Sequence, residues 1–263
     1  MLNSTTSSNS DKKRRWQIFF AIVFWIALWQ FASSQIGEEI LLVSPWVVLK
    51  TLVELVRQTD FWQAISFSFF RIVLGFIIAV VCGVGLAILS SQIYWIKVLV
   101  NPLASVVKST PVASFIILAL IWITSKNLSV FISFLMVFPI IYTNTLHGIL
   151  NTDKKMLEMA QVFHISAGKK FLNIYLPEVM PFFVSACSVS LGICWKSGIA
   201  AEVIGLPSGS IGEKLYHAKI YLNTGDLFAW TAVIILISIL FEKVFLSLLQ
   251  RLQVRIEGTG EKN

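Results

Sequence analysis

The sequence predicts an all-α polytopic membrane protein with about six transmembrane helices and a helical loop on the cytoplasmic side. Of the 263 residues, 56% are hydrophobic and only 13% are charged, which is typical of membrane proteins. The clearest apolar run, residues 72–89, has no polar side chain and is long enough to cross the hydrocarbon core with its flanks. The basic residues gather at the ends of such runs, so the net charge of +7 does not indicate nucleic-acid binding.

The apolar runs belong to one membrane domain, residues 16–250, between a disordered basic tail at residues 1–15 and a second tail at residues 251–263. The expected spans lie near residues 16–32, 72–89, 98–123, 128–146, 182–204 and 227–249. Basic residues at both ends place the N- and C-termini in the cytoplasm. A cleaved secretory signal is the alternative for the first run. Its length, its aromatic residues and the lack of a small-residue cleavage site favour an uncleaved span.

Local signals refine several of these segments. Ser44 before Pro45 predicts the start of a short interfacial helix on the external side, near residues 45–57. A polar break at residues 108–111 predicts that the third span is bent, and Pro139 predicts a kink in the fourth. Close approach of a neighbouring helix to the second span is predicted by three glycines, Gly75, Gly83 and Gly85.

A polar segment, residues 153–178, separates the fourth and fifth spans. Its pattern predicts two short helices joined by a turn near residues 164–168, with Gly168 free to adopt positive φ. In the first helix an apolar stripe recurs at helical spacing, formed by Met156, Met159, Ala160 and Phe163. An ordered helix pair in a cytoplasmic loop indicates a docking surface, and an amphipathic loop lying on the membrane is the alternative.

This segment resembles the EAA loop of ABC importer permeases, the membrane subunits of binding-protein-dependent transport systems. In that family Glu-Ala-Ala is followed after three residues by Gly, and after nine more by Ile-x-Leu-Pro. The matching positions here are Glu158, Ala160, Ile174, Leu176 and Pro177. Two positions depart from the motif, since Met159 replaces its second residue and His164 replaces its Gly. The resemblance covers roughly residues 45–250 and is nearest to the branch that imports nitrate, sulfonates and taurine.

The resemblance implies that the loop couples this chain to a separate ATPase. Glu158 would lie near the start of the first helix, where the helix dipole favours a carboxylate. Met159 and Phe163 would be apolar knobs, and Gly168 would form the turn. The residues assigned to the coupling loop are Glu158, Met159, Ala160, Phe163, His164, Gly168, Ile174, Leu176 and Pro177.

The resemblance also implies the partners of the chain. An ABC ATP-binding subunit would bind the ATP, a second permease subunit would complete a homodimer in the lipid bilayer, and an extracytoplasmic substrate-binding protein would deliver the solute. The chain itself would hold no cofactor, because residues 167–170 lack the earlier Gly and the closing Ser/Thr of a phosphate-binding loop. The expected location is the plasma (inner) membrane of a prokaryote.

The fifth span carries two ionisable residues, Lys196 and Glu202, which should face protein or water rather than lipid. With Trp195, they are candidates for the translocation path of a small anion such as nitrate, a sulfonate or taurine. The alternative is a buried structural role, and positions six residues apart lie on different faces of a helix. A neutral or cationic nutrient, such as a thiamine precursor, is the alternative solute.

Other classes of function fit the sequence less well. A secondary transporter is the less favoured alternative, because no internal repeat is visible. The chain is not expected to be an enzyme, since its Ser, His and Asp residues fall on different sides of the predicted membrane. No metal site is expected from the three cysteines, which lie inside apolar runs without partners at ligand spacing.

Overall fold

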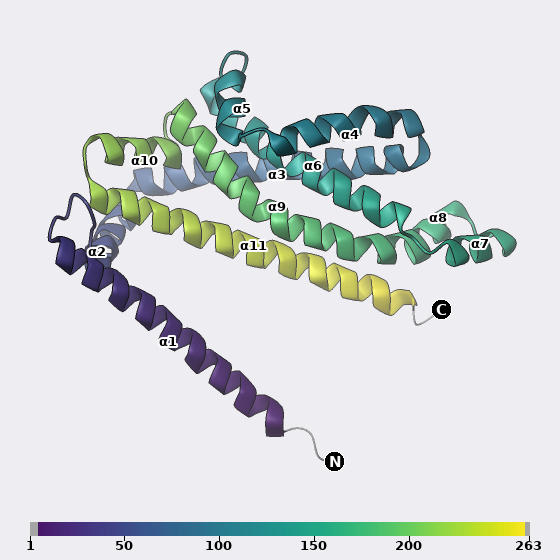
Figure 1. Ribbon diagram of the computed structural model, residues 1–263, viewed down its shortest axis with the longest axis horizontal. Coiled ribbons are helices and arrows are strands. Elements are labelled where there is room, and N and C mark those ends of the chain that lie inside the picture. The colour runs from purple at the N-terminus through teal and green to yellow at the C-terminus, as the bar shows by residue number, and fades with distance from the viewer. Residues whose placement is uncertain (1–4, 261–263) are drawn as a thin grey trace.

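The computed structural model describes the backbone of residues 5–260 and the side chains of residues 16–254. All secondary structure in this part of the chain is helical (Figure 1). The helices are α1 (Thr5–Ile36), α2 (Pro45–Val56), α3 (Thr59–Gln92), α4 (Tyr94–Ser109), α5 (Val112–Ala119), α6 (Ser125–Leu150), α7 (Lys154–Val162), α8 (Ala167–Lys170), a π-helical turn (Phe171–Tyr175), α9 (Leu176–Gly205), α10 (Ile211–Ile220) and α11 (Thr224–Gly260).

Five helical stretches among the described residues are long and apolar enough to cross a membrane. They are Trp16–Ile36 in α1, Thr59–Gln92 in α3, Ser125–Leu150 in α6, Ala167–Gly205, which ends in α9, and Thr224–Val254 in α11. The pair α4 and α5 makes a sixth span if its two halves count as one, and it bends by 106° at the predicted break. The bend falls where Thr110 adopts the extended conformation that a following proline favours, and Pro111 then precedes α5. In contrast, α6 continues through Pro139 as one helix.

The core is a layer of three helices in which α6 packs against both α3 and α9. Two of the three predicted glycines let α3 approach α6 closely. A Cβ atom at Gly83 would lie 2.9 Å from Ile141 Cγ2, and one at Gly75 would overlap the backbone oxygen of Val130. Gly85 faces open space instead, with nothing within 4 Å of an added Cβ. The prediction of close approach is therefore confirmed for Gly75 and Gly83 and wrong for Gly85.

Aromatic side chains join α11 to this core. Phe245 contacts Phe76 of α3, with 5.1 Å between ring centroids. Phe241 contacts both Phe69 of α3 and Trp195 of α9. Such edge-to-face pairs stabilise the packing beyond the apolar area that they bury.

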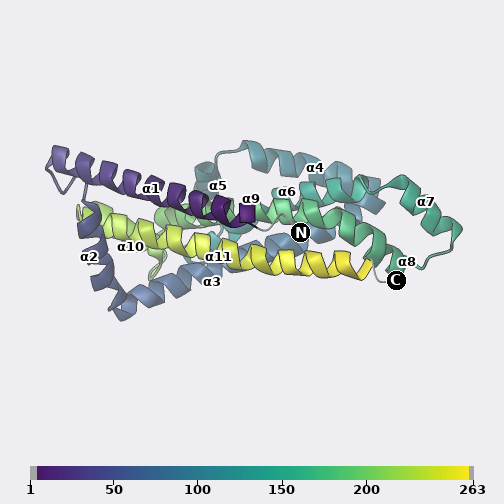
Figure 2. The same cartoon turned by 90° about the horizontal axis from the view of Figure 1, so that it is seen from below.

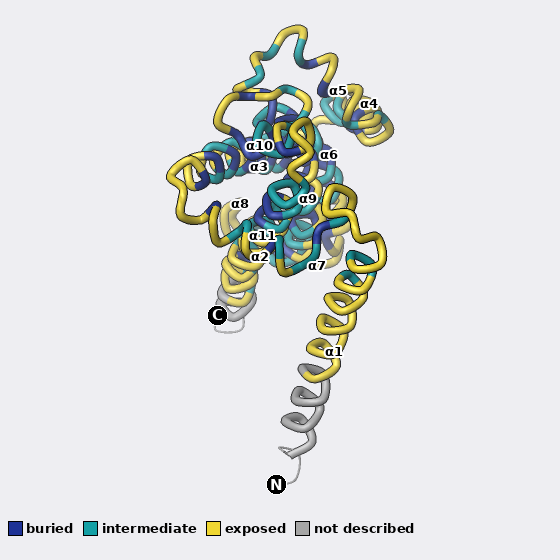
Figure 3. Tube along the Cα trace, turned by 90° about the vertical axis from the view of Figure 1, so that its left-hand side faces the viewer, coloured by how far each residue is buried: buried dark blue, intermediate teal, exposed yellow. Residues whose placement is uncertain are grey.

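The two ends of the bundle carry different elements, with α2 and α10 at one end and α7 and α8 at the other (Figures 1 and 2). At the first end, Ser44 accepts a hydrogen bond from the Val47 amide (3.4 Å) and Pro45 is the first residue of α2, so the predicted helix start is confirmed. In α1 the Trp16–Ile36 stretch lies apart from the bundle and is exposed over most of its length (Figure 3). Of the expected disordered tail, residues 1–4 lie outside the described residues, and the backbone of residues 5–15 continues α1 as helix.

Candidate coupling surface and solute path

The start of α7 is anchored by two carboxylates. Asp153 caps the helix, and its side chain accepts a hydrogen bond from the Lys155 amide (2.8 Å). The Asp153 amide donates in turn to Glu178 of α9 (3.2 Å). We did not single out Asp153 from the sequence, although an aspartate directly before a helical stripe is a capping signal. These contacts tie the projecting helix α7 to the start of the span that follows it.

The end of α7 is a Schellman motif centred on His164. The Ile165 amide donates to the Ala160 carbonyl (2.9 Å) and the His164 amide donates to the Gln161 carbonyl (3.1 Å). His164 has φ of 51°, the left-handed conformation that normally favours glycine. The predicted turn at Gly168 is wrong, because Gly168 lies in α8 and does not have positive φ. The chain reverses at the position where the EAA motif has its Gly.

The outer surface of α7 presents apolar side chains to solvent. Phe163 is 73% exposed, Val162 74% and Met159 44%, whereas Ala160 on the other side is buried at 1%. The predicted stripe is therefore split, with its small residue against the bundle and its large residues outside. Glu158 lies in the middle of α7 and not in its first turn, so the dipole argument for its position is wrong. Asp153, the N-cap residue, is the carboxylate that lies at the N-terminal end of the helix dipole of α7.

The second predicted helix does not stand alone but continues into a membrane span. After α8 the chain passes through the π-helical turn, in which the Leu176 amide donates to the Phe171 carbonyl, and then enters α9. The wide turn ends just before Pro177, which has no amide hydrogen to donate. Ile174 is buried at 6% exposure, and Leu176 and Pro177 are half-buried at the start of α9. Because α8, the π-helical turn and α9 follow one another without a break, a displacement of α8 would be transmitted directly to α9.

The three residues predicted for the solute path occupy different environments. Glu202 is fully buried, and its Oε2 accepts hydrogen bonds from Ser68 Oγ of α3 (2.6 Å) and the Gly212 amide of α10 (3.3 Å). Ser68 Oγ also accepts from the Ile211 amide (3.0 Å), so Glu202 and Ser68 together hold the start of α10. Lys196 is exposed on α9. The structure therefore does not bring Lys196 and Glu202 together.

Trp195 belongs to the core between α9 and α11. Only 2% of its surface is exposed, and its ring packs against Phe69 and Phe241. A second exposed lysine, Lys108, lies at the bend between α4 and α5, where its Nζ donates to Thr143 Oγ1 of α6 (2.9 Å). Lys108 belongs to the polar break predicted at residues 108–111 and was not among the residues predicted for the solute path.

An all-helical bundle of five or six apolar spans, with one projecting helix that exposes large apolar side chains, has the architecture of the membrane subunit of a transporter. The chain belongs to the family of binding-protein-dependent transport system inner membrane components, whose model matches residues 75–258. It is a multi-pass membrane protein and a permease subunit of an ABC importer, not an enzyme.

Individual relatives agree with this assignment. The chain is 30% identical over 243 residues to a protein of Escherichia coli (strain K12) named for aliphatic sulfonates transport, the permease protein SsuC, with 90% of each chain covered. It is 25% identical over 233 residues to the taurine transport system permease protein TauC of the same strain, covering 85% of this chain and 83% of TauC. A crystal structure of an amino acid ABC transporter with histidines has the same fold, with a TM-score of 0.59 at 18% identity over 78% of this chain and 98% of that one.

Proposed function

We propose that α7 docks on a separate ATP-binding subunit and transmits its movements to the spans. The observation that carries this proposal is the exposure of Met159, Val162 and Phe163 on a short helix whose opposite side is held to the bundle. Aromatic residues and methionine are enriched in protein interfaces, where a polar rim surrounds an apolar centre. Because α8 continues into α9, closure of the ATPase dimer would move α9 and change the side to which the path is open.

Cross-linking tests the docking directly. We expect Phe163→Cys, labelled with a maleimide that carries a benzophenone group in membranes containing the complete transporter, to photo-cross-link to the ATP-hydrolysing subunit. The matched control is Ser208→Cys, which is exposed at the opposite end of the bundle. Failure of Phe163→Cys to capture that subunit, or its labelling by a membrane-impermeant reagent added from outside the cell, would overturn the coupling role.

The proposed assembly has two permease chains, two ATP-binding subunits and an extracytoplasmic binding protein. The α7–α8 end would face the cytoplasm together with both chain termini, and α2 and α10 would face the binding protein. An even number of crossings, six if α4 and α5 count as one span, would leave both termini on the same side, which supports this arrangement. The lysines of residues 154–155 and 169–170 at the α7–α8 end support this orientation.

The solute that we propose is a small oxyanion of the nitrate, sulfonate or taurine class. The names of the relatives SsuC and TauC support this class. Within this chain, Lys196 and Lys108 are two exposed cations on membrane-spanning elements, where an unpaired charge is costly unless it faces water or a ligand. A neutral or cationic nutrient would gain nothing from these two lysines.

Substitution of Lys196 tests the solute class. We expect Lys196→Gln to lower the uptake of a short alkyl sulfonate roughly tenfold, because a hydrogen bond to a charged group is lost. The control is Lys243→Gln, an exposed lysine of α11 at which uptake should stay unchanged. Unchanged uptake in Lys196→Gln, with normal amounts of the complex in the membrane, would remove Lys196 from the path.

A further inference from the structure

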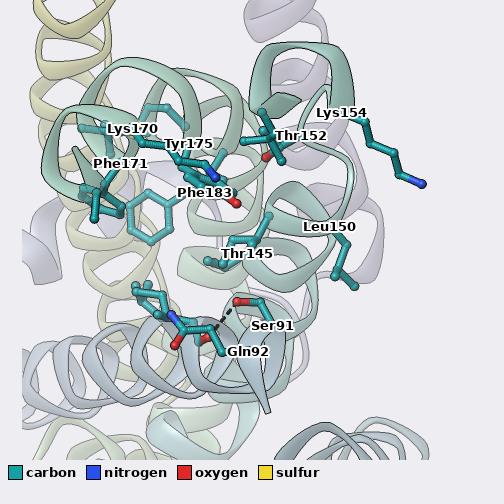
Figure 4. Close-up of a pocket in the computed structure, with 18 residues that line it drawn as sticks. Ser91, Gln92, Thr145, Leu150, Thr152, Lys154, Lys170, Phe171, Tyr175 and Phe183 are labelled. Carbon is teal, nitrogen blue, oxygen red and sulfur yellow. Dashed lines mark hydrogen bonds between the residues drawn. The ribbon is translucent and has the colours of Figure 1, made fainter. Parts of the chain in front are cut away.

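A cavity of about 670 Å³ lies at the α7–α8 end of the bundle (Figure 4). Its walls are the last turns of α3 and α6, the first turns of α9 and the segments on either side of the α7–α8 turn. The volume falls in the range of sites for organic ligands, and the lining is mostly apolar. None of the residues assigned to the coupling role or to the solute path occupies this cavity, apart from Leu176 at its edge.

Most of the side chains that line the cavity are apolar. They include Val84 of α3 and Phe183 of α9, both within membrane-spanning helices. Thr145 also lines the cavity, but it is only 2% exposed and its hydroxyl is shielded from solvent. Such a lining favours the apolar part of a ligand, for example an acyl chain.

Lys170 is a basic residue of the cavity lining. Its amine lies over the ring of Tyr175, 5.9 Å from the centroid, and no described carboxylate forms an ion pair with it. Figure 4 shows that the side chain of the other lining lysine, Lys154, points away. The cavity therefore combines the positive charge of Lys170 with a mostly apolar lining.

We propose that this cavity binds an anionic phospholipid from the leaflet on the α7–α8 side, with its phosphate at Lys170 and an acyl chain against Val84 and Phe183. A small free anion would leave the apolar lining uncovered, and a lipid without net charge would leave Lys170 without a counter-ion. Val84 and Phe183 belong to apolar membrane-spanning helices whereas Lys170 ends α8, so the acyl chain and the phosphate would each meet side chains of matching chemistry. The proposal depends on the fold and not on the coupling role or the solute.

Neighbouring lysines provide a matched test. Lys169 is exposed and does not line the cavity, whereas Lys170 does. The complete transporter is placed in nanodiscs of equal parts phosphatidylglycerol and phosphatidylcholine, extracted mildly, and the retained lipids are counted by mass spectrometry. We expect phosphatidylglycerol to be enriched, and Lys170→Gln to lower its ratio to phosphatidylcholine roughly fivefold, while Lys169→Gln leaves the ratio unchanged.

A further variant fills the cavity. Ser91 of α3 lines it, so Ser91→Trp should abolish retention of phosphatidylglycerol. Because Lys170→Gln leaves the apolar lining intact, that variant decides the question even if the filled variant does not assemble. The proposal is wrong if wild type retains the two lipids equally, or if Lys170→Gln and Lys169→Gln have the same effect.

Discussion

Replacing Phe163 by aspartate and Glu158 by lysine is expected to lower binding-protein-stimulated ATP hydrolysis by roughly 30-fold or more, the loss typical of one interface hot spot. Phe163 ends α7 with most of its surface exposed, so a charge there does not disturb the bundle but would be buried by a docked subunit. Glu158 lies on the same exposed helix, and reversing its charge would place a like charge against any cation that it meets. The measurement is ATP hydrolysis by the reconstituted complex, with and without loaded binding protein.

The control for this variant is Gln161→Asp, which adds a negative charge on the same helix without removing an apolar side chain. Its stimulated hydrolysis should stay within about threefold of wild type, since charges outside a hot spot contribute little to an interface. Equal amounts of both variants in the membrane would show that insertion is intact. Full stimulation in the double variant, Phe163→Asp with Glu158→Lys, would count decisively against docking through α7.

Gly75→Ala is expected to destabilise the bundle by about 1–3 kcal/mol, the range for forcing extra volume into a packed core. An added Cβ would overlap the Val130 oxygen and lie 2.8 Å from Ser133 Cβ, both on α6. Because the overlapped atom belongs to the backbone, relief requires that α3 and α6 move apart. The unfolding temperature in mild detergent, followed by tryptophan fluorescence, should fall.

The matched variant is Gly85→Ala, on the same helix but facing open space. Alanine is better than glycine in a helix interior by roughly 0.5–1 kcal/mol, so this variant should be neutral or slightly stabilised. If both variants changed the unfolding temperature equally, helix propensity and not the contact between α3 and α6 would govern the effect.

The segment of residues 153–178 illustrates what can be predicted from a sequence motif. Its location, its two-helix form and the apolar character of its knobs could be predicted, because they depend on spacing within a short segment. The predicted position of its turn was wrong, because glycine is the default residue for a left-handed conformation and Gly168 was the only one in the segment. The structure places that conformation at His164, where two hydrogen bonds of the helix end hold a residue that adopts it less readily.

The role of Glu202 could not be predicted. A carboxylate in an apolar run can bind a ligand, line a solute path or make a buried structural contact. Only the side chains that surround the carboxylate distinguish these roles. Its partners are Ser68, which is 134 residues away in the chain, and the start of α10. Nothing in the local pattern around Ser68 distinguishes it from other small polar residues of α3.

The sequence by itself determined the membrane class, a bundle of about six spans, the bend at Pro111 and the helical segment between α6 and α9. These features follow from hydropathy, helix periodicity and proline, which act over a few turns of chain. Only the tertiary structure decided which glycines contact α6, which face of α7 is exposed, where Glu202 and Lys196 lie, and that a cavity lined by Lys170 forms at the α7–α8 end. Those features depend on side chains from helices far apart in the chain, and helix packing alone determines which of them meet.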